Sequence, residues 1–325
     1  MEVSCSDLFI LSRPPIALSS LACVVDLSKP SARLLLGASL QSLTLQLPDE
    51  STTASIINDA IVTISRLPVL ESLQLHLRSF SPEVSFAPFA GTPRLKELCC
   101  ETGCLGELSH AQLDQLRMLP RLRTMSVRGD DLEYLLRAPH SLQWQRIHRV
   151  RSLDDDTAAA LSTLPTLTEL ATDRCRSVAF LPALTCLRSL QLGMDPDVDV
   201  AEGIALGLPY CTQLTDLSLR GAHDVTSRHL SQALSHLPAL RVLSLMCCSA
   251  LESLSFLSEC SHLAHSLRSL KLYGSKRVPS TELTHVLTLK SLTHLTICEF
   301  FVDPLDATTQ TETTVVARAA EAQEI

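Results

Sequence analysis

The chain has 325 residues, of which 46% are hydrophobic, 4% aromatic and 19% charged, and its formal net charge at pH 7 is −8. Its 10 glycines and 17 prolines exclude a collagen-like or glycine-rich low-complexity chain, and its apolar content excludes wholesale disorder. The acidic balance argues against a nucleic-acid binder, and no apolar run reaches the roughly 18 residues that a membrane span needs.

Residues 1–39 precede the first clear repeat of the sequence. Glu2 and Asp7 stand where a secretory signal would carry basic residues, and Arg13, Pro14 and Pro15 interrupt the apolar stretch that follows. We therefore expect no signal peptide. We expect this segment to form an N-terminal cap or a worn first repeat, because a repeat array needs the end of its core covered.

The pattern Leu-x-x-Leu-x-Leu recurs through residues 40–302. Clear copies begin at Leu40, Leu70, Leu187, Leu214, Leu240, Leu267 and Leu292, and weaker copies begin at Leu95, Leu122, Leu142 and Leu167. The starting leucines are separated by about 25 residues on average, which is a leucine-rich repeat period. The sequence thus resembles a leucine-rich repeat protein and predicts one solenoid of about eleven units.

Each unit is predicted to contain a strand and a short helix. Alternate side chains of a strand face opposite ways, so the second and third leucines of the motif point into the core. Helix-start residues include Asp154, Thr226 and Ser280, the last predicting a helix over residues 281–289, and Pro165 and Pro238 separate helices from the next strands. The resemblance implies an α/β horseshoe with parallel strands on the concave face and short helices on the convex face.

Residues 303–325 differ in character from the repeats. They are rich in Thr, Ala and Glu and show no apolar periodicity beyond Val315 and Val316. We expect a polar, poorly ordered C-terminal tail with a short helix over residues 317–323.

The unit from Leu214 to Thr226 carries a more specific resemblance. It is similar to the cysteine-containing group of leucine-rich repeats, with Ala222 where that group has cysteine, and Cys175 and Cys248 occupy the same place in their own units. The resemblance implies an intracellular protein-recognition module that binds a partner on its concave face. Its alternative is a substrate-recognition subunit of an F-box type ubiquitin ligase, whose F-box is missing or supplied elsewhere, because residues 1–39 contain no recognisable F-box.

The 12 cysteines follow no regular framework, and two pairs are adjacent in the chain. Free thiols behave as small buried hydrophobes, so we expect a reducing cytoplasmic or nuclear setting, with disulfides as the less favoured alternative. Cys260, His262 and His265 are residue types that suit zinc, but their spacing matches no standard site. Asp195, Asp197 and Asp199 lack the glycine and distant glutamate of a calcium loop, and Asp199 serves equally well as a helix cap.

We accordingly expect no metal and no cofactor. No nucleophile elbow, phosphate-binding loop or His-Glu-x-x-His motif occurs, so we also expect no enzymatic activity.

A basic and aromatic cluster around Trp144 gives the predicted partner-binding site. Trp144 alternates with the inward positions of its unit, so it should lie on the concave face, and arginines and aromatic residues are frequent at binding hot spots. A second, smaller cluster comprises Lys271 and Tyr273 on the tenth unit, with Arg220 and Met246 on neighbouring units. The predicted partner-binding residues are Arg123, Arg128, Trp144, Arg146, His148, Arg149, Arg220, Lys271 and Tyr273. The hypothesis is an acidic protein partner; the alternative is that Trp144 fills a gap beside Gln145 and the arginines are ordinary solvated side chains. The sequence gives no oligomeric state.

Overall fold

In the computed structural model, the described part of the chain comprises residues 2–3, 19–24, 38–47, 53–77, 81–92, 94–102, 108–119, 122–126, 129–136, 145–150, 152–274, 277–298 and 301–302. The chain divides into two compact units, Met1–His148 and Arg149–Ile325. The predicted tail at 303–325 and most of the predicted cap at 1–39 lie outside the described residues.

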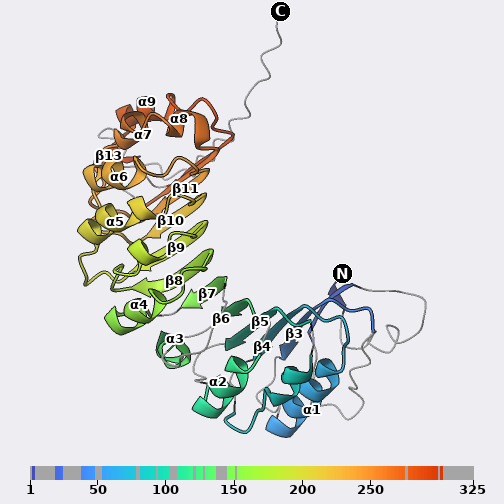
Figure 1. Ribbon diagram of the computed structural model, residues 1–325. Coiled ribbons are helices and arrows are strands. Elements are labelled where there is room, and N and C mark those ends of the chain that lie inside the picture. The colour runs from blue at the N-terminus through green and yellow to red at the C-terminus, as the bar shows by residue number, and fades with distance from the viewer. Residues whose placement is uncertain are drawn as a thin grey trace, which may run out of the picture. The chain divides into compact units, whose positions relative to one another are not determined.

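The first unit is a parallel sheet in which, from residue 42 onward, a helix lies between each strand and the next (Figure 1). Its strands, which pair in chain order, are β1 (Glu2–Val3), β2 (Ser20–Val24), β3 (Ser42–Leu47), β4 (Ser72–Leu77), β5 (Glu97–Thr102), β6 (Thr124–Ser126) and the start of β7 (Arg146–Val150). Its helices are α1 (Ala54–Ser65), η2 (Ala87–Gly91), α2 (His110–Arg117) and α3 (Gly129–Leu136).

The repeat leucines form the core of this unit. Leu43, Leu73 and Leu98 are direct partners on β3, β4 and β5, and each is at most 1% exposed. Helix α1 adds Ile61 and Ile64, both fully buried, from one face of its turn. Side chains at this spacing line one stripe of a helix, and that stripe covers the leucines of the sheet.

The second unit repeats the same plan. Its main strands, parallel and in chain order, are β8 (Glu169–Cys175), β9 (Ser189–Met194), β10 (Asp216–Arg220), β11 (Val242–Met246), β12 (Ser269–Tyr273) and β14 (His294–Cys298), and a separate pair is β13 (Val278–Pro279) with β15 (Phe301–Val302). Its helices are α4 (Asp155–Leu161), η3 (Leu181–Ala183), α5 (Ala201–Gly207), η4 (Leu208–Tyr210), α6 (Ser227–Leu234), α7 (Phe256–Glu259), α8 (Leu263–Ser266), η5 (Ser280–Glu282) and α9 (Leu283–Val286).

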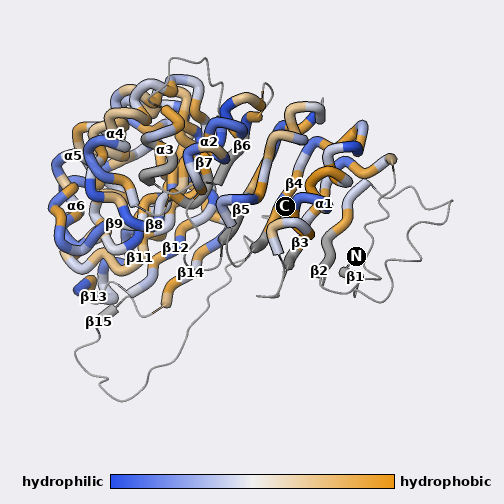
Figure 2. The backbone as a smooth tube through the Cα atoms, turned by 90° about the horizontal axis from the view of Figure 1, so that it is seen from below, coloured by the Kyte–Doolittle hydropathy of each residue, from blue (hydrophilic) through white to orange (hydrophobic). Residues whose placement is uncertain are grey.

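Equivalent motif positions are paired across this sheet. Leu217 pairs with Leu190 on one side and with Leu243 on the other, and the ladder continues to Leu270 and Leu295. The first four of these leucines are at most 1% exposed. The prediction that the motif leucines form parallel, inward-facing rows is therefore confirmed within each unit. Hydrophilic positions of α5 and α6 lie at the periphery of the second unit (Figure 2).

A helical segment begins at or next to each of the three predicted starts. Asp154 accepts a hydrogen bond from the backbone N–H of Thr157 at 2.9 Å, and Thr226 closes a capping box with His229. The helix predicted over residues 281–289 forms over Ser280–Val286, as η5 running directly into α9, and ends three residues earlier than predicted. The Glu282 carboxylate accepts hydrogen bonds from Ser253 Oγ at 2.5 Å and from the backbone N–H of Leu254 at 2.9 Å, which tie this segment to the preceding repeat.

A recurrent turn follows three of the strands. Gly221, Cys247 and Gly274 have φ of 70°, 56° and 67°, the left-handed region that glycine tolerates best. Each donates its backbone N–H to the carbonyl of the last residue of the next strand, at 2.7, 2.7 and 3.0 Å. The turn thus fastens successive units at the carboxyl ends of their strands.

In two of these turns, the residue directly after the left-handed one occupies the position that holds cysteine in cysteine-containing repeats. Ala222, Cys248 and the equivalent Cys175 are fully buried. Burial raises the pKa of the Cys175 and Cys248 thiols to about 12. The expected burial of thiols is confirmed here and at Cys211 and Cys260, but it is wrong at Cys247, which is exposed, and Cys99, Cys186 and Cys298 are only partly buried. The buried thiols act as core residues, since the reactive thiolate is suppressed.

Candidate functional site

The predicted site falls partly outside the described residues. Arg128 and Trp144 lie outside them, and so do the side chains of His148 and Arg149, whose backbone belongs to β7. The cluster expected around Trp144 therefore stays a prediction.

Arg123 and Arg146 lie at the strands of the first unit. Arg146 is the partner of Thr124, which is in turn the partner of Glu97, and its Nη1 lies 3.7 Å from Glu97 Oε1. Both side chains are more than 40% exposed, so this pair contributes at most about 1 kcal/mol. Arg123 is half-buried just before β6, and its backbone carbonyl accepts from Gln145 and Arg146.

Three predicted residues come together on the sheet of the second unit. Arg220, Met246 and Tyr273 are successive partners on β10, β11 and β12, so their side chains leave the sheet on the same face. Lys271, two residues before Tyr273, is exposed on that face too. We call Arg220, Met246 and Tyr273 the outer row. It is a basic, thioether and aromatic strip on the face away from the buried leucines.

A hollow of about 800 Å³ lies next to the outer row, at the carboxyl ends of β8, β9 and β10. Arg220 is one of its lining residues. The others are Ser152, Asp173, Arg174, Arg176, Gly193, Met194, Asp195 and Gly221. Arg174 and Arg176 were missed by the sequence reasoning, although their position on either side of the inward Cys175 was a usable signal for two outward side chains.

The shape of this hollow follows from a bulge in β8. Thr172 pairs with Leu192 and Cys175 with Met194, so β8 has two residues where β9 has only Gly193. A Cβ atom on Gly193 would lie 2.3 Å from the Asp173 carbonyl oxygen, so only glycine fits there. Gly193 therefore leaves a place without a side chain between Arg220 and the bulge.

The charges of the hollow are unevenly paired. Arg176 Nε lies 3.5 Å from Asp195 Oδ2, whose side chain is 14% exposed. Arg174 and Arg220 are exposed and make no ion pair with any described residue. Two guanidinium groups thus face the solvent beside a depression in the sheet.

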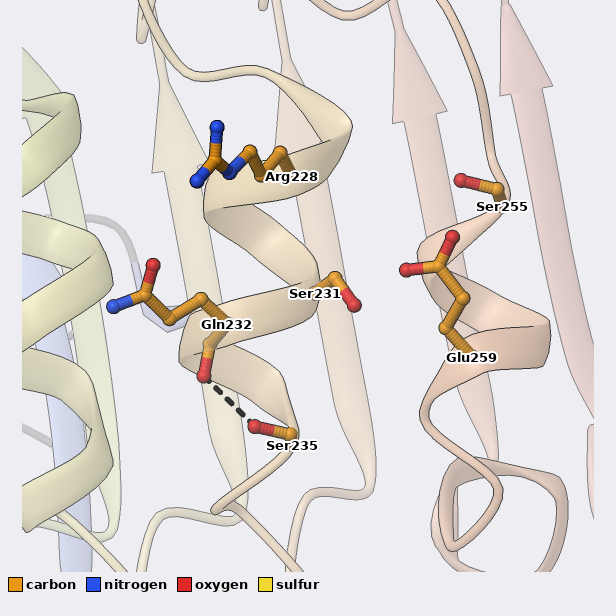
Figure 3. Close-up of a pocket in the computed structure, with 6 residues that line it drawn as sticks. All are labelled: Arg228, Ser231, Gln232, Ser235, Ser255 and Glu259. Carbon is orange, nitrogen blue, oxygen red and sulfur yellow. Dashed lines mark hydrogen bonds between the residues drawn. The ribbon is translucent and has the colours of Figure 1, made fainter.

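A second hollow, of about 500 Å³, lies between α6 and α7 on the helix side (Figure 3). Ser231 points from α6 toward α7, whereas Arg228 and Gln232 point away from it. Hydrogen bonds from Ser231 and Ser255 lower the pKa of Glu259. These groups form a polar contact between the two helices.

Two carboxyl groups meet near the start of α5. Asp224 Oδ2 accepts from the backbone N–H groups of Val200 and Ala201 at 2.6 and 2.8 Å, and Asp199 Oδ1 accepts from Ala201 at 3.1 Å. Burial, and then the hydrogen bond with Asp199, raise the pKa of Asp224. Asp199 is thus part of a helix-start cap, as its alternative interpretation predicted.

Two further features of the described residues bear on the site. No group of three or more His, Cys, Asp or Glu side chains among them could hold a metal ion. None of the helices they form combines the length and apolar character needed to cross a bilayer.

Comparison with known proteins extends the description of the fold. No protein-family model matches the chain, and no curated protein matches it either. The chain is similar to the crystal structure of the Rad7 and Elc1 complex in yeast, with a TM-score of 0.59 and 14% sequence identity, over 97% of this chain and 84% of that chain. At this identity the likeness concerns the fold alone. With the parallel strands, it indicates an α/β fold of the leucine-rich repeat kind.

Proposed function

We propose that the chain recognises a partner protein on the exposed face of its parallel strands, the concave face of a leucine-rich repeat horseshoe, and catalyses no reaction of its own. The observation that carries the proposal is the outer row, in which Arg220, Met246 and Tyr273 stand in register on one face of the sheet. Arginine, methionine and aromatic side chains are enriched at protein interfaces.

The rigidity of the repeat supports the same proposal. The strands are already ordered in the folded chain, so binding on them loses little conformational freedom. The similar solved structure is that of a complex of two proteins, which fits a role in protein interaction. The buried thiols fit the reducing cytoplasm or nucleus as the place of action.

A pair of matched tyrosine variants tests this proposal. The full chain, as wild type, as Tyr273→Ala and as Tyr210→Ala, is used to capture proteins that are then quantified by mass spectrometry. Tyr210 is 56% exposed on η4, on the helix side of the same unit. We expect Tyr273→Ala to lose a captured protein at least tenfold and Tyr210→Ala to retain it. Equal capture by all three chains, with unchanged thermal unfolding, would contradict the proposal.

The captured proteins also test the ligase alternative, for which the supporting observation is the resemblance of the unit around Ala222 to cysteine-containing repeats. A ubiquitin-ligase adaptor that co-purifies with every variant, Tyr273→Ala included, would favour a substrate-recognition subunit. A partner retained without ligase components would favour a stand-alone scaffold or inhibitor. The cluster around Trp144 is proposed as a second contact region, and the double change Trp144→Ala and Arg146→Ala tests it in the same assay.

A further inference from the structure

We infer, on the basis of the proposed function, that the hollow beside β8, β9 and β10 binds an acidic segment of the partner protein, with carboxylates paired to Arg174 and Arg220. This assigns a partner chemistry and two contact residues to one end of the strand face.

The first support is the way in which the hollow is built. The bulge in β8 directs the chain of Asp173 and Arg174 over Gly193, where no side chain can be accommodated. Arg220 is the partner of Gly193 on the other side. The two arginines therefore lie on either side of a strand position that only glycine can occupy, and the hollow between them comes from backbone geometry.

The second support is charge. The lining contains three arginines and two aspartates, a formal charge of 3 − 2 = +1, in a chain whose net charge is −8. Arg176 is paired with Asp195, which leaves Arg174 and Arg220 without an ion pair among the described residues. A guanidinium group presents parallel N–H donors that match the two oxygens of a carboxylate. The guanidinium groups of Arg174 and Arg220 are therefore suited to bind an anionic ligand, and their planar geometry suits carboxylates.

The third support is continuity with the outer row. Arg220 belongs to both the hollow and the row that continues to Met246 and Tyr273. Parallel strands are about 4.8 Å apart, so β8 and β10 are separated by about 10 Å, which an extended chain spans in about three residues. A segment with carboxylates two or three residues apart can reach both Arg174 and Arg220, and its next residues can lie on Met246 and Tyr273.

A labelled peptide tests this inference directly. Binding of fluorescein-labelled hexaglutamate to the purified full chain is followed by fluorescence anisotropy, with hexalysine as the peptide control. We expect saturable binding of hexaglutamate that weakens as salt is raised from about 50 to about 200 mM, since the contacts are ionic. Arg174→Glu and Arg220→Glu should each weaken it at least tenfold. Arg228→Glu, the same charge change on the exposed surface of α6, should leave it unchanged.

Three outcomes would overturn the inference: no binding of hexaglutamate by the wild type, equal weakening by Arg228→Glu, or displacement of the peptide by millimolar inorganic phosphate, which would make the hollow a small-anion site. Arg220→Gln replaces Arg220→Glu if the latter unfolds early. Failure here is distinct from failure of the proposed function. If Tyr273→Ala still abolishes capture while hexaglutamate does not bind, the strand face is the binding surface and the acidic segment is wrong.

Discussion

Replacement of Gly193 by alanine tests whether the bulge in β8 shapes the strand face as described. The added Cβ atom would lie 2.3 Å from the carbonyl oxygen of Asp173, 2.9 Å from its carbonyl carbon and 3.2 Å from the carbonyl oxygen of Thr172. All three are backbone atoms, so relief requires one strand to move by about 1 Å. Overpacking of this kind usually destabilises by about 1–3 kcal/mol, and a backbone obstacle places Gly193→Ala at the upper end.

A smaller effect acts in the opposite direction. Alanine restricts the unfolded chain more than glycine does, which stabilises the folded state by about 0.4–1 kcal/mol where alanine fits without strain. The net expectation for Gly193→Ala is a loss of about 2 kcal/mol in the free energy of unfolding. Gly91→Ala is the matched control, because a Cβ atom at Gly91 would meet nothing within 4 Å.

Urea unfolding followed by circular dichroism measures both changes. We expect Gly193→Ala to unfold at clearly lower urea than the wild type and Gly91→Ala to unfold at the same concentration or slightly higher. If Gly193→Ala matched the control, the Asp173 carbonyl would not be held against Gly193, and the account of how the hollow is built would be refuted.

Three further substitutions probe other parts of the second unit. Cys247→Gly should raise the free energy of unfolding by about 0.5–1 kcal/mol, because Cys247 has φ of 56° and a left-handed conformation costs a non-glycine residue about 1–2 kcal/mol. The greater conformational freedom of glycine in the unfolded chain offsets part of this gain. A loss of stability in urea unfolding would show that the turn is not strained. Leu243→Ala should lower the free energy of unfolding by about 3 kcal/mol, because this fully buried side chain packs between Leu217 and Leu270. A change under 1 kcal/mol would contradict the packed core. Asp224→Asn should change the pH dependence of stability: the raised pKa of Asp224 means that the folded state favours its protonated form, so this contribution is present at low pH and is lost as pH rises through the folded-state value. Asparagine keeps a neutral hydrogen-bonding group at every pH, so the stability of Asp224→Asn relative to the wild type should be greater at pH 7 than at pH 4. An equal difference at the two pH values would contradict the raised pKa of Asp224.

The sequence predicts the sheet well because its signal is repeated. Leu217, Leu243 and Leu270 occupy the same position in successive motifs and are direct partners across the sheet. Because inward side chains recur at every second residue, a one-residue shift in pairing would turn these leucines outward, so the motif fixes the register of each strand pair. Arg220 and Tyr273 were both predicted as partner-binding residues, and the strand register places them on the same outward face.

The parts that the sequence did not predict depend on local departures from the repeat. The bulge between Thr172 and Cys175 arises where Thr172 takes the place of a core leucine, and a single sequence does not show that an extra residue is accommodated there. The sequence therefore did not predict that Arg174 lies beside Gly193 in the same hollow as Arg220. The helix predicted after Ser280 is shorter than expected and begins as a 3₁₀ turn, where Glu282 makes tertiary contacts with the preceding repeat.

The graded burial of the repeat leucines has a consequence for how the second unit opens. Leu243 and Leu270 are fully buried, whereas Leu295 and Ile297 on β14 are half-exposed. In a linear repeat array each repeat is stabilised only by its neighbours, so a repeat whose core residues are less buried opens at a lower free energy. Amide protons of β14 should therefore exchange with solvent before those of β11 and β12, and transient opening should advance from β14 toward β11.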